Sequence, residues 1–161
     1  MANTQGARRR FLLERLPESD VLAVDPAVCV GCRTCELMCS LFHTGHFDLA
    51  AARLYVDRRP FAAQFTPEVC RQCLAPACYV VCPVEGAMTI DASTGARRIV
   101  AERCVGCGAC ADACPWNGDG HIIRWNAAAS VYEKCDMCGG APQCVAYCPV
   151  HALTYVAKEG R

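Results

Sequence analysis

Between its polar, cysteine-containing stretches the chain shows short apolar segments separated by turn-forming residues. This pattern predicts short strands and hairpins. The clearest hairpin signal is the pair Ala87–Ile90 and Arg98–Ala101, which flanks the turn residues Asp91–Gly95. Further candidate strands are His121–Trp125 and Val131–Lys134, which flank Asn126–Ser130, and the single segments Leu54–Asp57 and Ala152–Val156.

Short helices are expected where the chain presents the last cysteine of a motif, at Thr34–Leu41, Cys110–Cys114 and Cys144–Cys148. Helices and strands of this length bury little apolar surface, so they need another source of stability. The pattern therefore predicts an α+β fold of short β-hairpins and short helices, stabilised by more than its apolar core.

The cysteine residues are the expected source of this additional stability. The 161 residues contain 16 cysteines, and all of them fall into four groups of four. Three groups end in Cys-Pro, and the first ends in Cys39-Ser40. The groups are Cys29, Cys32, Cys35 and Cys39; Cys70, Cys73, Cys78 and Cys82; Cys104, Cys107, Cys110 and Cys114; and Cys135, Cys138, Cys144 and Cys148.

This is the ligand spacing of bacterial ferredoxins, in which cysteine thiolates hold 4Fe–4S clusters and the last cysteine of one run binds the neighbouring cluster. Four groups predict four 4Fe–4S clusters with all sixteen cysteines as iron ligands. Metal binding would then contribute heavily to folding, and loss of the clusters should unfold the chain.

Other uses of cysteine fit less well. A disulfide framework needs an oxidising compartment. Four closely spaced, repeated cysteine motifs also fit metal sites better than a set of disulfide cross-links. Zinc sites usually combine two separated cysteine pairs. Histidine ligation of the Rieske kind replaces two cysteines on one iron, and no cysteine is missing here. His43 and His46 are therefore expected beside a ligand or on the surface.

The four motifs alternate between two forms. The first and third are regular, whereas the second and fourth have extra residues and a proline, Pro76 or Pro142, before the third cysteine. This alternation indicates a duplicated two-cluster unit. The first motif could pair with the second and the third with the fourth, or the outer two and the inner two could pair. Spacing alone does not choose between these schemes.

Three motifs, Cys29–Cys39, Cys70–Pro83 and Cys104–Asn117, resemble the four-cluster iron–sulfur subunits of molybdenum and tungsten oxidoreductases. These include the beta-type subunits of dimethyl sulfoxide reductase and formate dehydrogenase. The resemblance extends from about Ala27 to Val156. The chain looks most like the compact subunit beside tungsten-containing aldehyde oxidoreductases, for which Cys32–Leu37 followed by Ser40–Gly45 is typical.

The resemblance implies a duplicated bacterial-ferredoxin-like fold in which one unit is inserted into the other, so that the outer motifs pair and the inner motifs pair. It implies an outer unit of residues 27–66 with 130–161, an inner unit of residues 67–129, and an N-terminal arm of residues 1–26. The implied ligand sets are Cys29, Cys32, Cys35 with Cys148; Cys39 with Cys135, Cys138, Cys144; Cys70, Cys73, Cys78 with Cys114; and Cys82 with Cys104, Cys107, Cys110.

Charge and hydropathy exclude some classes of protein. Sixteen basic residues balance sixteen acidic ones, whereas nucleic-acid binders usually carry a basic excess. No run approaches the roughly 20 apolar residues of a membrane span. Arg8–Leu13 superficially resembles a twin-arginine export signal, but Glu14 and later charges interrupt its apolar stretch. We expect a soluble, cytoplasmic chain in which this segment forms a short amphipathic docking helix.

Several residues next to the motifs have two interpretations. Lys134 and Arg103 each precede the first cysteine of a motif and could tune a cluster potential, but solvent-facing positions are expected for both. Aromatic residues near the motifs could shield a cluster or line a docking face, and ordinary packing is expected for them. They are Trp116, Trp125, Tyr132 and Tyr147.

No dinucleotide loop, phosphate loop or catalytic triad occurs, so the chain is interpreted as a non-catalytic electron-transfer subunit. By resemblance its catalytic partner is a tungsten or molybdenum pterin enzyme that oxidises aldehydes, and its second partner is a flavin- or NAD-linked subunit. Two alternatives stay open: a module that assembles head to tail into conducting filaments, and a free-standing polyferredoxin that serves several enzymes.

Overall fold

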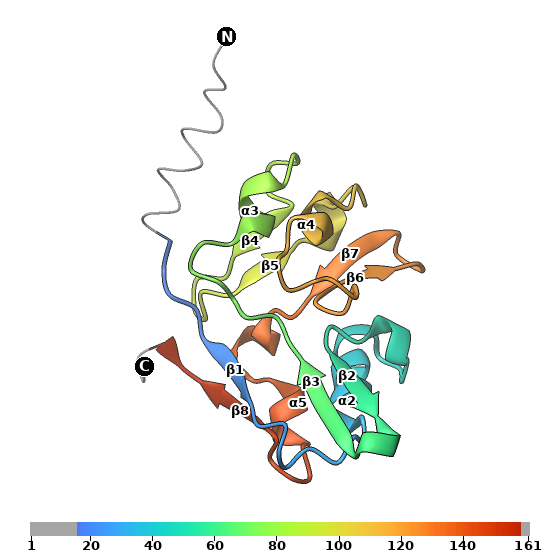
Figure 1. Ribbon diagram of the computed structural model, residues 1–161. Coiled ribbons are helices and arrows are strands. Elements are labelled where there is room, and N and C mark those ends of the chain that lie inside the picture. Colours follow the sequence, from blue (N-terminus) through green and yellow to red (C-terminus); the bar gives the residue numbers. More distant parts are fainter. Residues whose placement is uncertain (1–15, 159–161) are drawn as a thin grey trace.

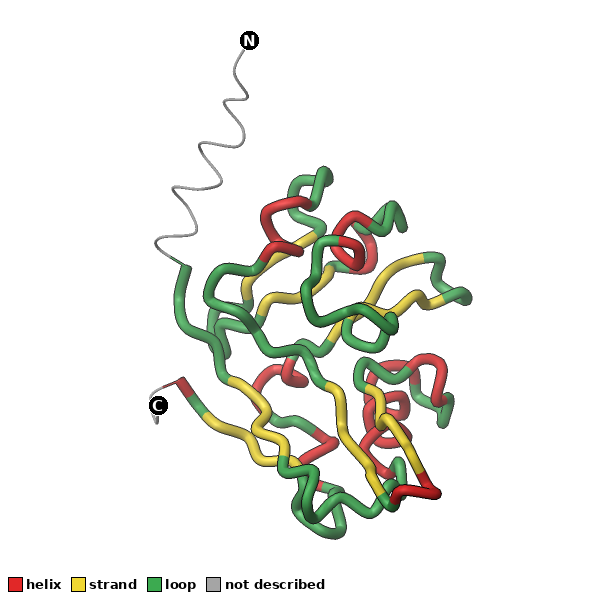
Figure 2. Tube along the Cα trace, in the orientation of Figure 1, coloured by secondary structure: helices red, strands yellow, loops and turns green. Residues whose placement is uncertain are grey.

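The computed structural model describes residues 16–158, and the proposed docking helix at Arg8–Leu13 lies outside them. Four antiparallel strand pairs and several short helices are connected by long loops (Figures 1 and 2). The strand pairs are β1 (Val21–Val24) with β8 (Leu153–Val156), β2 (Tyr55–Arg59) with β3 (Gln64–Glu68), β4 (Met88–Ile90) with β5 (Arg97–Ile99), and β6 (Ile123–Asn126) with β7 (Val131–Lys134).

The helices are short, as predicted. They are α2 (Thr34–Thr44), α3 (Ala77–Val81), α4 (Ala109–Asp112) and α5 (Gln143–Ala146), with 3-10 turns η1 (Leu49–Ala51), η2 (Pro60–Ala62), η3 (Ala101–Arg103) and η4 (Met137–Gly140). Within residues 16–158 no helix has the length and apolarity needed to cross a bilayer. The predicted α+β class, with short hairpins and short helices, is confirmed.

The elements gather into two halves (Figure 1). An upper half, residues 69–134, contains α3, α4 and the strand pairs β4–β5 and β6–β7. A lower half combines residues 16–68 with residues 135–158, and in it α2 contacts α5 while β1 pairs with β8. Helix α3 contacts α4 in the same way in the upper half. The structure thus brings the first motif beside the fourth and the second beside the third.

Two boundaries differ from the expected ones. Val21–Val24 was expected in the N-terminal arm, but it forms β1, with Val21 opposite Val156 and Val24 opposite Leu153. Val131–Lys134 was expected in the outer unit, but it forms β7 and pairs with β6 in the upper half. The reason is the same in both cases: a strand joins the half that offers its backbone N–H and C=O groups hydrogen-bond partners.

The apolar core depends on the motif residues. Of the 23 buried apolar residues that the structure describes, eight are cysteines. The others include Leu54, Ile123, Met137 and Leu153, each at most 2 % exposed. These side chains pack between the cysteine motifs rather than forming a separate core, because the strand pairs and helices are too short to cover one another.

Two glycines provide a matched pair of substitutions. Gly95 (φ 72°) and Gly45 (φ 78°) both have left-handed backbone conformations. A Cβ atom at Gly45, after α2, would meet nothing within 4 Å, whereas one at Gly95 would collide with the backbone oxygen of Glu18. We expect Gly45→Ala to cost about 1–2 kcal/mol of conformational energy.

Gly95→Ala should cost clearly more than Gly45→Ala, because the Glu18 backbone must also shift. Denaturant unfolding of the iron-loaded variants measures both changes. Equal destabilisation by the two substitutions would contradict the close approach between Gly95 and Glu18.

Candidate metal centres

The sixteen cysteines are free thiols, and tertiary structure gathers cysteines from different motifs. Cys35 interacts electrostatically with Cys148 of the fourth motif, and Cys39 interacts with Cys138. In the upper half, Cys78 of the second motif interacts with Cys114 of the third. These contacts follow from the pairing of α2 with α5 and of α3 with α4.

The four expected ligand sets are called sets I to IV. Set I is Cys29, Cys32, Cys35 and Cys148; set II is Cys39, Cys135, Cys138 and Cys144; set III is Cys70, Cys73, Cys78 and Cys114; and set IV is Cys82, Cys104, Cys107 and Cys110.

Sets III and IV each line a cavity. The four cysteines of set III, together with Arg97, Lys134 and Trp116, line a small cavity. The four cysteines of set IV line a second small cavity with Met88, Ile99 and Tyr132. Four thiols that line one common cavity are the donor set that a 4Fe–4S cluster requires.

The pKa values of the thiols show that ionising these cysteines is costly when no cation is nearby. Burial raises the pKa of Cys35 to about 12 and the pKa values of Cys39 and Cys110 to about 11. Burial also raises the pKa of Cys144 and the pKa of Cys135, and neighbouring thiolates add to both effects. An iron centre would reverse this penalty, since metal binding displaces the protons and neutralises the thiolates. The donor sets therefore fit iron–sulfur clusters.

Hydrogen-bond donors surround several sulfur atoms. The backbone N–H of Arg53 donates to Cys39 Sγ and that of Ala152 to Cys148 Sγ, both at 3.3 Å. The hydroxyl of Thr34 donates to Cys32 Sγ at 3.4 Å. Donors of this kind stabilise negative charge on sulfur and thereby raise the reduction potential of a cluster.

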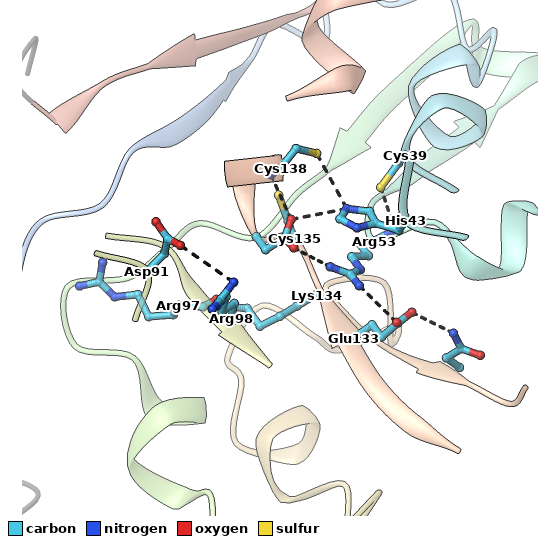
Figure 3. A network of polar contacts seen from close by, with 12 residues as sticks. Cys39, His43, Arg53, Asp91, Arg97, Arg98, Glu133, Lys134, Cys135 and Cys138 are labelled. Atoms are coloured by element: carbon cyan, nitrogen blue, oxygen red, sulfur yellow. Dashed lines mark hydrogen bonds and ion pairs between the residues drawn. The ribbon is translucent and has the colours of Figure 1, made fainter. Parts of the chain in front are cut away.

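A polar network lies beside set II (Figure 3). His43 Nε2 lies 3.8 Å from Cys138 Sγ and 3.5 Å from an oxygen of Asp136. Arg53 donates to the other Asp136 oxygen at 2.6 Å and to Glu133 at 3.3 Å. His43 thus lies beside a candidate ligand, whereas His46 is exposed, and both positions are ones that the sequence predicts.

Lys134 differs from its prediction. Solvent was expected around this side chain, but it is only 2 % exposed. It ends strand β7, which contacts β5, and its ammonium group donates a hydrogen bond to the backbone oxygen of Arg97 (Figure 3). Burial lowers its pKa, but the combined charges of Cys70, Cys78 and Cys135 and a hydrogen bond with Cys70 together raise it more, so the pKa is raised overall. Arg103 is exposed, as predicted.

The aromatic residues also differ from their prediction of ordinary packing. Trp116, Trp125 and Tyr147 are 47 %, 46 % and 53 % exposed. The guanidinium of Arg71, beside Cys70, stacks over the Trp116 ring at 3.7 Å. Tyr132 is half-buried and packs edge-on against Trp125. The exposed rings cover the protein surface next to the motifs instead of filling its interior.

Electrostatic interactions between cysteines also give the sets an order. Cys35 of set I interacts with Cys144 of set II, and Cys135 of set II interacts with Cys70 of set III. Cys78 of set III interacts with Cys110 of set IV. The sets therefore follow one another as I, II, III and IV.

The two terminal sets are also the accessible ones. Set I contains the exposed Cys32, and set IV contains the exposed Cys107. In set II three of the four cysteines are buried, and Cys138 is half-buried. The arrangement is a row of thiol sets with one exposed cysteine at each end.

Comparison with protein families identifies residues 61–158 as a 4Fe-4S dicluster domain. This range contains the second, third and fourth cysteine motifs. The chain is 38% identical over 135 residues to the polyferredoxin-like subunit of aliphatic sulfonate oxidoreductase from Pyrococcus furiosus, covering 84% of this chain and 75% of that protein. It is 35% identical over 159 residues to the electron transport protein HydN of Escherichia coli K12, covering 86% of this chain and 88% of HydN.

A third relative is longer. The beta subunit of NADH-dependent phenylglyoxylate dehydrogenase from Aromatoleum evansii is 39% identical over 137 residues, but the chain spans only 30% of its length. Among solved structures, a chain of the BamBC active-site complex of benzoyl coenzyme A reductase with benzoyl-CoA matches with a TM-score of 0.50 at 23% identity. That match covers 85% of this chain and 78% of the other, and it shows similarity of fold.

Proposed function

The chain belongs to the 4Fe-4S dicluster domain family, and on this basis we propose that it is an electron-transfer subunit that holds four 4Fe–4S clusters. Sets I to IV are the proposed ligands, and all sixteen cysteines take part. Each bound cluster would accept and release one electron at a time. The dicluster domain itself accounts for two clusters, and the complete first motif supports the larger number.

The observation that carries this proposal is the order of the four sets. Neighbouring sets lie close enough for electrostatic interaction between Cys35 and Cys144, Cys135 and Cys70, and Cys78 and Cys110. An exposed cysteine lies at each end of the row. A row of this kind suits a protein that exchanges electrons with two different partners at its two ends.

The surrounding residues support the same function. Buried positions keep set II from solvent, and backbone N–H groups hold negative charge on the sulfur atoms of Cys39 and Cys148. All sixteen proposed ligands are thiolates, which leaves no iron position for a substrate. The chain would conduct electrons and leave catalysis to a partner.

The partners are proposed from the relatives. Two of these relatives are subunits of oxidoreductases, an aliphatic sulfonate oxidoreductase and an NADH-dependent phenylglyoxylate dehydrogenase. We propose a tungsten or molybdenum pterin enzyme that oxidises aldehydes as the catalytic partner, and a flavin- or NAD-linked subunit as the other. The exposed Trp116, Trp125 and Tyr147 lie near the motifs and are available for such contacts.

Metal analysis tests the cluster number directly. Chain purified without oxygen should contain about 16 iron and about 16 sulfide, because four 4Fe–4S clusters are proposed. A redox titration followed by electron paramagnetic resonance should resolve four one-electron reductions. About 8 iron per chain would reduce the number of clusters to two, and zinc without iron would refute the proposal altogether.

A further inference from the structure

Lys134 lies where the two halves of the protein meet. It is the last residue of β7 in the upper half and precedes Cys135, a member of set II. Its side chain forms part of the wall of the set III cavity together with Cys70, Cys73, Cys78 and Cys114. One buried side chain therefore lies next to two of the four cysteine sets.

On the basis of the proposed function, we propose that Lys134 is a positioned cation that raises the reduction potential of the cluster held by set III, and to a smaller extent that of set II. It thereby favours electron transfer between the lower and upper halves. Lys134 holds no iron itself, and it acts through its charge on the cysteine sulfur atoms beside it.

The charges around Lys134 support this role. Its side chain lines the same cavity as Cys70 and Cys78, and its backbone directly precedes Cys135. Within residues 16–158 it makes no ion pair with a carboxylate within 4.0 Å. The backbone oxygen of Arg97 accepts a hydrogen bond from the ammonium group and fixes its position.

Arg53, beside set II, differs from Lys134 because carboxylates pair with it. Its guanidinium pairs with Asp136 at 2.6 Å and with Glu133 at 3.3 Å, so two carboxylates offset its charge. No carboxylate within residues 16–158 pairs with Lys134, so its positive charge acts on the neighbouring sulfur atoms. Burying an ammonium group away from water is costly unless anionic groups compensate for it. An electron added to a cluster supplies more negative charge, so a nearby cation favours the reduced state.

The neighbours of Lys134 are held in place. Gln72 is 3 % exposed, donates to the Cys135 backbone oxygen at 2.9 Å and accepts from the Arg97 backbone N–H at 2.8 Å. The Arg97 guanidinium donates to the backbone oxygens of Gly95 and Pro17 at 2.8 and 2.7 Å. Because these hydrogen bonds hold the neighbours of Lys134 in place, the ammonium group stays close to the cavity.

The test compares three variants in iron-loaded protein. Lys134→Met removes the charge and keeps the apolar stem, and Lys134→Arg retains the charge. Lys158→Met removes the only other lysine of the chain, whose ammonium group donates to the backbone oxygen of the exposed Ser93 at 2.8 Å. The two Met variants therefore change the net charge equally, but at different places.

We expect Lys134→Met to shift the reduction equilibrium of one cluster at least tenfold toward the oxidised form, which is about 59 mV for a one-electron couple. A second cluster should shift less. Lys134→Arg and Lys158→Met should leave all four potentials near those of the wild type. The most affected signal should be the one that disappears in Cys114→Ser, a member of set III.

Four unchanged potentials in Lys134→Met protein that holds about 16 iron would overturn the role of Lys134 and leave the electron-transfer proposal intact. Equal shifts in Lys134→Met and Lys158→Met would also overturn it. If Lys134→Met protein does not hold iron, the wild type decides the question. In chain labelled with ¹⁵N-lysine, hyperfine spectroscopy of the reduced clusters should detect a ¹⁵N coupling that persists in Lys158→Met, and absence of that coupling would refute the proposal.

Discussion

Iron removal is expected to unfold the chain. Anaerobic treatment with a chelator and a thiol reductant should abolish most far-ultraviolet circular dichroism and leave no cooperative unfolding transition. The reason is the composition of the core: eight of its 23 described apolar residues are cysteines, and the strand pairs have only three to five residues per strand. Without metal, buried thiols surround unfilled cavities, and elements this short cannot stabilise themselves.

Reconstitution provides the control for this experiment. Adding ferrous iron and sulfide to the reduced, unfolded chain should restore both the cluster absorption and the circular dichroism. An iron-free chain that retains native secondary structure and slow amide exchange would show that packing alone maintains the fold, and it would contradict the expectation.

The second large effect concerns the ligand sets. Cys148→Ser should alter or remove the same paramagnetic signal as Cys32→Ser, with up to about 4 of about 16 iron lost in each case, because both residues belong to set I. Cys148 is buried and lies in the last motif, whereas Cys32 is exposed and lies in the first. The packing of α2 on α5 brings these two motifs together, and Cys148 contributes to the raised pKa of Cys35.

The competing arrangement gives a different result. If the third and fourth motifs shared their clusters, Cys148→Ser would remove the same signal as Cys107→Ser. Comparing the three variants by electron paramagnetic resonance and iron content therefore distinguishes the two schemes. None of the three substitutions changes a cysteine of set II, so that set keeps its four thiols throughout the comparison.

Local sequence patterns were sufficient to predict much of the fold. The hairpin around Asp91–Gly95 appears as β4 and β5, because its turn residues and flanking apolar residues act over a short range. Helix α2 begins at Thr34 as expected and extends to Thr44, where the backbone N–H of Gly45 donates to Leu41. Strand β3 was missed, since Gln64–Glu68 contains a proline and few apolar residues.

Long-range pairing could not be predicted from local patterns. Spacing left two ways to pair the motifs, and only the packing of α2 on α5 and of α3 on α4 brings particular motifs together. Lys134 was expected in solvent because lysine usually is, yet the end of β7 places it between the halves. No local signal distinguishes it from the exposed Arg103.

The pairing of β1 with β8 has a consequence for biosynthesis. Val21 lies opposite Val156, so the lower half cannot close until residues up to Val156 have left the ribosome. The upper half needs only residues up to Lys134 and contains all eight cysteines of sets III and IV. Because chains fold progressively as they emerge, the upper half can begin to fold while Cys148 is still inside the ribosome. A nested topology thus also sets an order of maturation, in which the inserted half is completed first.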